Sequence, residues 1–128
     1  MSTYSIRLSD EVILAIKASD DRILGLLARD VLADKSTLSR LLDHYCQDDL
    51  GTVDSGAIEI DEERSSIDEK NSGFLLMCFQ EEAYYGCRDM DKSEERECEV
   101  GFQINVGEKR IVFSVPESSR PSYFHENE

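Results

Sequence analysis

The sequence predicts an α+β fold in which about three N-terminal helices pack on a mostly antiparallel C-terminal sheet of three to five strands. Apolar residues recur at helical spacing in the first part of the chain and at strand spacing in the second. Helices that precede the strands, instead of alternating with them, favour an α+β fold over a parallel βαβ design. We therefore expect a single domain over residues 1–116, with a helical part at 9–50, a sheet part at 56–116, and a mobile acidic tail at 117–128.

The first predicted elements are a short strand and a helix that follows it directly. Residues 4–8 alternate apolar and polar side chains, which is the pattern of a strand. Ser9 then stands where a helix N-cap belongs, and the acidic residues Asp10 and Glu11 suit the positive end of a helix dipole. The apolar side of this helix consists of Val12, Ile13, Ala15 and Ile16.

Two further helices are predicted before residue 51. The second carries its apolar residues between Ile23 and Val31, at helical spacing. Either Asp34 or Ser36 caps the third helix. We expect this helix to end near Gly51, because glycine is the favoured residue after a helix C-terminus.

The first half of the sheet part has a mixed pattern. Residues 57–60 indicate a short strand, and the charged residues 61–71 indicate an exposed loop or a short polar helix. Residues 74–79 are apolar on both faces, which predicts a central strand covered on one side by the helices. We expect a turn at residues 80–82, a further strand at residues 83–87 and a polar loop at residues 89–94.

The clearest element is a hairpin between Glu95 and Val115. Apolar residues from Cys98 to Val106 alternate with polar ones, and the alternation returns from Ile111 to Val115. Gly107 lies between the two runs, which predicts a short turn and antiparallel pairing. One face of the hairpin is therefore expected to be core, and the other face to be wet and acidic at its start.

The chain is strongly acidic. Its 128 residues carry 28 acidic and 14 basic side chains, which gives a formal net charge of −14 at pH 7. Nineteen of the acidic and eight of the basic residues lie after residue 50, so the acidity belongs mainly to the sheet part. Such a charge serves solubility or attracts a basic partner, and it argues against an extended nucleic-acid surface, which needs a basic patch.

The acidic start of the hairpin is the predicted partner surface. In a strand, Glu95, Glu97 and Glu99 point to one face at a spacing of about 6.8 Å. The preceding segment adds acidic residues and two tyrosines, and aromatic side chains are frequent anchors in protein interfaces. The residues that we assign to a basic partner are Glu81, Glu82, Tyr84, Tyr85, Asp89, Asp91, Glu95, Glu97 and Glu99. The alternative is a solvated sheet face without a partner.

No pattern in the sequence indicates catalysis, a metal or a cofactor. It contains no glycine-rich phosphate loop, nucleophile elbow or His-Glu-x-x-His motif, and no two cysteines have C-x₂-C spacing. We therefore expect no catalytic residue, no metal ligand and no cofactor. Because the first residues do not resemble a signal peptide and no apolar run could span a bilayer, we expect a cytoplasmic protein with free thiols.

Residues 27–42 (Leu-Ala-Arg-Asp-Val-Leu-Ala-Asp-Lys-Ser-Thr-Leu-Ser-Arg-Leu-Leu) resemble a helix-turn-helix DNA-binding segment. The small Ala28, the short turn and the polar opening of the second helix carry the resemblance. It implies that the second helix enters the major groove of DNA. The implied DNA contacts are Lys35, Ser36, Thr37, Ser39 and Arg40. Residues 4–11 instead look like the strand-then-helix start of ribbon-helix-helix repressors, and the two resemblances exclude each other.

These observations predict a small acidic binding protein without enzymatic activity. It would inhibit or neutralise a basic partner protein, such as a nuclease or another nucleic-acid-binding protein, by occluding its functional surface. An immunity protein, an antitoxin and a phage anti-defence inhibitor all fit this description. The alternative is a transcriptional regulator of the helix-turn-helix type.

Overall fold

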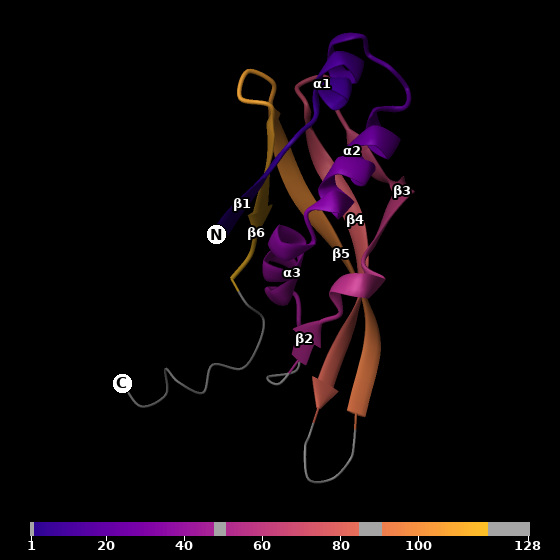
Figure 1. The fold of residues 1–128 in the computed structure, drawn as a ribbon, viewed down its shortest axis with the longest axis vertical. Coiled ribbons are helices and arrows are strands. Elements are labelled where there is room, and N and C mark those ends of the chain that lie inside the picture. Colours follow the sequence, from indigo (N-terminus) through magenta and orange to yellow (C-terminus); the bar gives the residue numbers. More distant parts are fainter. Residues whose placement is uncertain (1, 48–50, 85–90, 118–128) are drawn as a thin grey trace, which may run out of the picture.

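A curled antiparallel sheet and a layer of helices form the protein (Figure 1). The computed structural model describes residues 2–47, 51–84 and 91–117. In these residues the strands are β1 (Ser2–Arg7), β2 (Gly51–Val53), β3 (Glu59–Ile67), β4 (Ser72–Tyr84), β5 (Asp91–Asn105) and β6 (Arg110–Val115). The helices are α1 (Asp10–Lys17), α2 (Ile23–Ala33), α3 (Lys35–Asp43) and the short 3₁₀ helix η1 (Ser55–Ala57).

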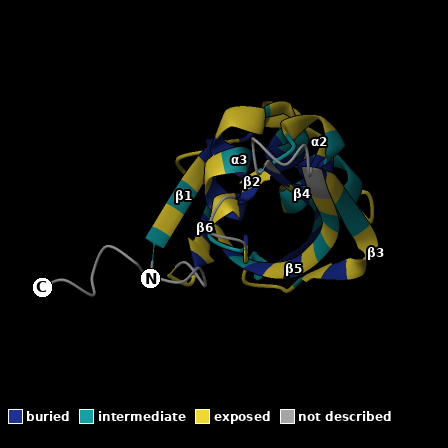
Figure 2. Cartoon of the chain, turned by 90° about the horizontal axis from the view of Figure 1, so that it is seen from below, coloured by how far each residue is buried: buried dark blue, intermediate teal, exposed yellow. Residues whose placement is uncertain are grey.

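The six described strands follow the order β1-β6-β5-β4-β2, and β3 also pairs with β4. Strands β2 and β3 share one edge of β4, with β2 beside Glu81–Ala83 and β3 beside Gly73–Cys78. The sheet curls into a half-barrel, and the helices cover its open side (Figure 2). A curl of this kind follows from the right-handed twist of strands, which accumulates across a sheet of long strands.

The core lies between the inner face of the curled sheet, which faces the helices, and the apolar sides of the helices. Leu75, Met77 and Phe79 of β4 are almost fully buried there. Phe102 of β5 and Phe113 of β6 pair across the two strands, and their rings meet edge to face at 6.4 Å. The helices contribute Val12, Ile13, Leu27, Val31, Leu38, Leu41 and Leu42 to the same cluster.

Side-chain caps start two of the helices. The Ser9 hydroxyl accepts a hydrogen bond from the Val12 amide at 3.4 Å, which confirms the predicted cap of α1. Of the two candidates for α3, Asp34 is the cap, because its carboxylate accepts a bond from the Thr37 amide at 3.1 Å. Asp34 is also the only residue between α2 and α3, so the two helices are joined by a very short connection.

The predicted fold class is wrong about the sheet. The described residues form six strands where three to five were expected, and they curl into a half-barrel. One of the six, β1, precedes the helices and pairs with β6 at the opposite end of the chain. The sequence pattern underestimates the sheet because several polar segments that resemble loops belong to its strands. Their exposed polar side chains lie on the outer face of the sheet, which points away from the helices.

The charged segment at residues 61–71 is one such correction, since β3 extends to Ile67. Its register with β4 shifts between Asp61 and Ser66, which marks a bulge. The Asp61 carboxylate accepts bonds from the amides of Glu63 and Arg64, and the Ser65 hydroxyl accepts a bond from the Leu76 amide of β4 at 2.9 Å. These side chains replace ladder bonds that the bulge interrupts.

Three predicted boundaries around β4 and β5 also change. The turn expected at residues 80–82 is part of β4, and the loop expected at 89–94 gives way to β5 from Asp91 onward. The strand expected at 83–87 is the end of β4 as far as Tyr84, and residues 85–87 lie outside the described residues. The tail predicted at 117–128 stays a prediction, because residues 118–128 also lie outside them.

Helix α3 ends at Asp43, well before the predicted end near Gly51. Gly51 instead begins β2 and pairs with Ala83. A Cβ atom at Gly51 would lie 2.0 Å from Oε2 of Glu81, so glycine is needed for the close approach of β2 to that side chain. A glycine that permits close packing and one that ends a helix look the same in a sequence.

The predicted antiparallel pairing of the hairpin and its short turn are confirmed, and the structure gives the register. Residues Gly101–Asn105 of β5 pair with Arg110–Ser114 of β6. In the turn, the Asn105 side chain accepts a bond from the Glu108 amide at 3.0 Å, and Lys109 adopts a positive φ of 56°.

Gly73 gives a test of the close contact between β3 and β4. A Cβ atom there would lie 2.0 Å from the carbonyl oxygen of Ser66, which is backbone and cannot rotate away. We expect Gly73→Ala to lower the free energy of unfolding by about 1–3 kcal/mol, measured by denaturant titration. Gly101→Ala is the matched control, because the nearest atom to its Cβ would be 3.9 Å away. Equal effects of the two substitutions would contradict the register of β3.

Candidate partner-binding surface

Three glutamates of β5 form an exposed row on the outer face of the sheet. Glu95, Glu97 and Glu99, which we call the glutamate row, are all exposed. The residues that alternate with them lie on the inner face, where Cys98 and Val100 are buried and Arg96 is partly buried. The alternation places every carboxylate of the row on the same side of the strand.

The outer face next to the row combines a partly apolar stripe with further acids. The β4 residues opposite Glu97 and Glu99 are Cys78 and Leu76. On the other side of β4, the same two residues face Glu59 and Asp61 of β3. Since directly paired residues share a face, acidic side chains flank the β4 stripe on both sides.

Arg64 of the β3 bulge connects the two acidic sides. Its guanidinium donates to Asp61 at 2.7 Å and to Glu97 at 2.6 Å, so the side chain reaches across β4. Through these bonds Arg64 holds the pKa values of the Glu97 and Asp61 carboxyls below their ordinary range. Glu95 and Glu99 have no ion-pair or hydrogen-bond partner among the described side chains, so no described cation lies against their carboxylates.

A buried ion pair lies on the inner face at the same level as the row. Glu81 of β4 is 3% exposed, although it is charged. It accepts a bond from Arg96 of β5 at 2.8 Å and from the backbone amide of Gln47, which follows α3, at 3.0 Å. Arg96 also contacts Glu94 at 2.9 Å. The cluster joins β4, β5 and the end of the helical layer where the apolar core stops.

The structure divides the predicted partner-binding residues into three groups. The glutamate row and Glu82 are exposed on the outer face. Glu81 lies on the inner face and is used by Arg96 and Gln47, so it adds nothing to the exposed surface. Tyr84 of β4 pairs with Asp91 of β5 at the described end of this strand pair, and the positions of their side chains are not described. Tyr85 and Asp89 lie outside the described residues.

The residues assigned to DNA under the alternative lie on α3 with different exposures. Lys35, Ser36 and Arg40 are exposed. Thr37 is buried, and its hydroxyl donates to the capping Asp34 at 2.9 Å. The Ser39 hydroxyl is buried without a hydrogen-bond partner among the described residues. The helix-turn-helix interpretation stays a prediction.

A groove beside α3 was not predicted from the sequence. It encloses about 420 Å³, and its walls come from Tyr4, Ser39, Arg40, Asp43, His44, Thr52 and Val53. The Tyr4 hydroxyl and the His44 Nε2 lie 2.7 Å apart, which fastens β1 to the end of α3. The two residues are 40 positions apart, so no local pattern could have indicated their contact.

The described thiols and carboxylates do not form a metal site. No group of three His, Cys, Asp or Glu side chains among the described residues is placed to hold a metal ion. Cys46 and Cys98 are buried, and burial raises the pKa of the Cys98 thiol to about 12. A thiol with that pKa is neutral near pH 7 and behaves as a small apolar side chain.

No protein-family model matches this chain, and neither do any curated protein or any solved structure. Function therefore has to be inferred from the surface itself, because a fold does not define an activity. Within the described residues, no helix has the length and apolar character that crossing a bilayer requires.

The buried pair of Glu81 and Arg96 gives a stability prediction. Arg96→Leu leaves the Glu81 carboxylate buried without its cation, which we expect to lower the free energy of unfolding by about 3 kcal/mol. Glu81→Leu combined with Arg96→Leu should recover most of the loss, because no uncompensated charge then remains. Denaturant titrations of the wild type, the two single variants Arg96→Leu and Glu81→Leu, and the double variant give the coupling energy. If Arg96→Leu lowers the free energy of unfolding by less than about 1 kcal/mol, the ion pair does not stabilise the contact between β4 and β5.

Cys78 provides a chemical probe of the outer face. Burial and, after it, the negative charge of Glu97 raise the pKa of the Cys78 thiol, whose sulfur lies 3.6 Å from that carboxylate. Glu97→Gln should therefore increase the thiolate fraction near pH 8 and speed alkylation by iodoacetamide about threefold. Mass spectrometry of timed samples measures the rate at Cys78 in a Cys87→Ser background. Glu95→Gln is the control, and an equal acceleration by it would contradict the specific contact.

Proposed function

We propose that this protein is a non-enzymatic inhibitor that binds a basic, nucleic-acid-handling partner with the outer face of β3, β4 and β5. The observation that carries the proposal is the glutamate row, which is exposed and only partly neutralised. Binding there would cover the basic surface that the partner uses for nucleic acid. Immunity proteins, antitoxins and phage anti-defence inhibitors are classes whose action has this chemistry.

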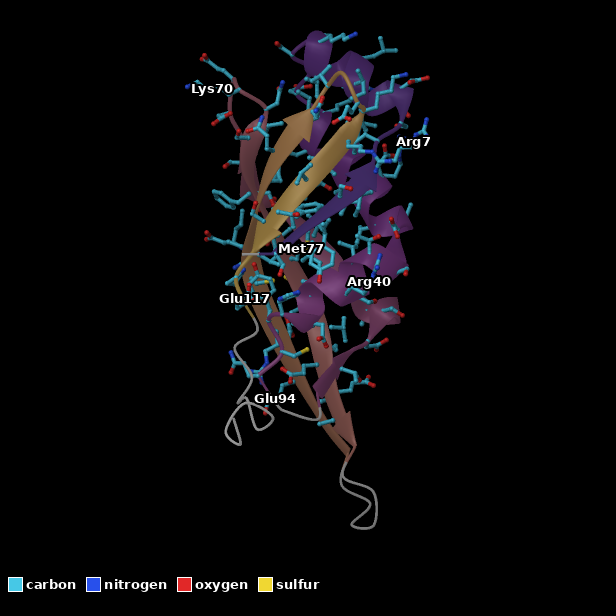
Figure 3. All side chains as sticks on the ribbon, turned by 90° about the vertical axis from the view of Figure 1, so that its left-hand side faces the viewer. Arg7, Arg40, Lys70, Met77, Glu94 and Glu117 are labelled. Carbon is cyan, nitrogen blue, oxygen red and sulfur yellow. The ribbon has the colours of Figure 1, made fainter. Side chains whose placement is uncertain are left out.

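The charge distribution on the outer face supports an oriented encounter. The acidic side is made by Glu59, Asp61, Glu82, Glu95, Glu97 and Glu99, and Arg64 is the cation that reaches across it. Arg7 and Arg110 pair at the far end of the face, across β1 and β6. Figure 3 shows Arg7 in the upper part of the molecule and Glu94, the sequence neighbour of Glu95, in the lower part. A polarised face of this kind steers a basic partner and sets its orientation.

The β4 stripe supplies contact area between the acids. This contact area comes from Phe74 and Cys78, which are partly exposed on the outer face, whereas Leu76 between them is buried. A less polar centre with a charged rim is the usual anatomy of a specific protein interface. An exposed sheet face also suits the occlusion of a partner better than the turnover of a small substrate, which needs a concave pocket.

Charge reversal tests the proposal. Replacing Glu95, Glu97 and Glu99 by Lys should slow association with the partner about tenfold or more and flatten its dependence on salt. The partner is the basic protein that the wild-type chain retains from host extract at low salt, identified by mass spectrometry and then purified. Stopped-flow association rates at several salt concentrations make the comparison, and circular dichroism checks that the variant is folded.

The matched control carries the same change of charge away from the proposed surface. Asp21, Glu69 and Glu108 lie in turns at the other end of the molecule, and their replacement by Lys should reduce the association rate much less. Equal rates for the wild type and the row variant would reject the glutamate row as the partner surface. Equal slowing in the two variants would show that only net charge matters.

A further inference from the structure

We propose that the partner adds an extended basic segment to the open edge of β5, as an extra strand beside the glutamate row. This inference rests on the proposed function and specifies how the partner binds. It concerns the backbone of β5 as well as its side chains. The two contributions can therefore be separated by experiment.

The edge of β5 next to the row is unpaired in the described part of the chain. Strand β6 pairs with β5 only at Gly101–Asn105. From Asp91 to Val100, no described segment forms backbone hydrogen bonds with that edge. The β4–β5 register runs without a shift from Tyr84 to Ser72, and this part of β5 contains no proline. An unbulged strand with one free row of donors and acceptors is the template that strand addition requires.

The direction of the backbone groups alternates along β5, and one hydrogen bond shows which residues point their N–H and C=O groups toward the open edge. The Ile104 amide donates to the Asn71 carbonyl at 2.9 Å, so the backbone of Ile104 points toward β4. Because the direction alternates along an antiparallel strand, the backbone of Arg96 and Cys98 also points toward β4. The N–H and C=O groups of Glu95, Glu97 and Glu99 therefore point toward the open edge.

The hydrogen bonds of β4 confirm this alternation. Gln80 pairs with Glu95, and its carbonyl accepts a bond from the Asp54 amide on the side away from β5 at 3.0 Å. A residue that bonds outward on β4 must face one that bonds outward on β5. Each glutamate of the row thus presents an exposed carboxylate together with an amide and a carbonyl that no described residue binds.

This coincidence defines the segment that fits. In an added antiparallel strand, the residues that exchange hydrogen bonds with the row lie directly opposite it, with their side chains on the same outer face. Lysine or arginine at these positions would meet the carboxylates of Glu95 and Glu99, which have no other described partner. The residues between them would face the inner side beside Arg96 and Cys98, where a further cation is unfavourable. The partner segment should therefore alternate basic and uncharged residues.

The same charges exclude a second copy of this chain as the occupant. Antiparallel pairing of β5 with itself would bring one glutamate row against another, and like charges opposite each other destabilise a strand pair. Charged edge residues are a common protection against self-association. Here the protecting charges on the outer face are all negative. They therefore disfavour pairing with a second copy of this chain but favour pairing with a basic strand.

Hydrogen exchange of the free full-length protein tests whether the edge is open. The amides of Glu95, Glu97 and Glu99 should exchange at least about tenfold faster than those of Arg96, Cys98 and Val100, as measured by NMR. Protection of the row amides in the free protein would show that the chain's own tail or a second copy already covers the edge. Either result would overturn the proposal.

Peptide binding tests the mode of recognition. The probe is a short peptide of alternating lysine and threonine, which should bind at low salt and protect the row amides from exchange. N-methylation of its lysines, whose amides would face β5, should weaken binding about tenfold, whereas N-methylation of its threonines should not. The two methylated peptides have the same charge, so a difference between them reports backbone pairing.

A pair of protein variants gives the reciprocal test. Glu97→Pro removes an outward N–H and blocks the edge with its ring, without removing a bond to β4. Glu97→Gln removes the same charge, and with it the ion pair with Arg64, but leaves the edge open. Only the proline variant should lose the difference between the two methylated peptides.

The outcomes separate this inference from the proposed function. Equal binding of the two methylated peptides would overturn strand addition and leave binding by the acidic face intact. No binding of any of the peptides at low salt would overturn both. Discrimination between the peptides that persists in Glu97→Pro would place the added strand at another edge and also overturn the inference.

Discussion

The unshifted pairing of β4 with β5 is the constraint on which the rest of the structure depends. All 13 residues of β4 take part in it. The other strands cover only portions of the pair, with β6 at one end of β5 and with β3 and β2 along the far edge of β4. Because a slip of one residue would exchange the two faces, this pairing decides which side chains of β4 and β5 enter the core. It also fixes the direction of every backbone group on β5.

The inner face of this hairpin changes its chemistry where the helical layer ends. From Leu75 to Phe79 it is apolar and packs against helices, whereas Glu81 and Arg96 continue it as an ion pair. Removing two charges from water is costly, and the cost is offset here by the Gln47 amide and by the close bond between the two side chains. An ionic end of the core lets the hairpin extend past the helices (Figure 1) without exposing apolar side chains.

Local patterns predicted those elements whose pattern is determined by the core. The Ser9 cap and the hairpin with β6 follow from periodicity and from side-chain chemistry close in sequence. Strand β2 and most of β3 do not follow from such patterns, because β2 has only three residues and the polar residues of the bulged β3 resemble a loop. The pairing of β1 with β6 could not be predicted either, because the two strands are far apart in sequence and meet only in the tertiary structure.

The candidate surface shows the same division. The common direction of Glu95, Glu97 and Glu99 followed from alternation alone. The burial of Glu81 could not be predicted, because it depends on Arg96 in the neighbouring strand and on Gln47 after α3. The neutralisation of Glu97 depends in the same way on Arg64, 33 residues away. Charge patterns in a sequence therefore locate an acidic face, but the charges that remain unpaired are known only when the strands are paired.

The electrostatic attraction of the glutamate row and the backbone hydrogen bonds of the open edge of β5 act over different distances. The field of an exposed row extends about 8 Å at physiological salt, and it attracts any basic surface without regard to its shape. Hydrogen bonds to the edge form only at contact and only with an extended backbone. A surface that had only the row would be a general binder of cations, and one that had only the edge would aggregate with other strands. In the proposed binding mode, their combination on the same three residues requires a partner to satisfy both conditions, which would make one short stretch of β5 selective.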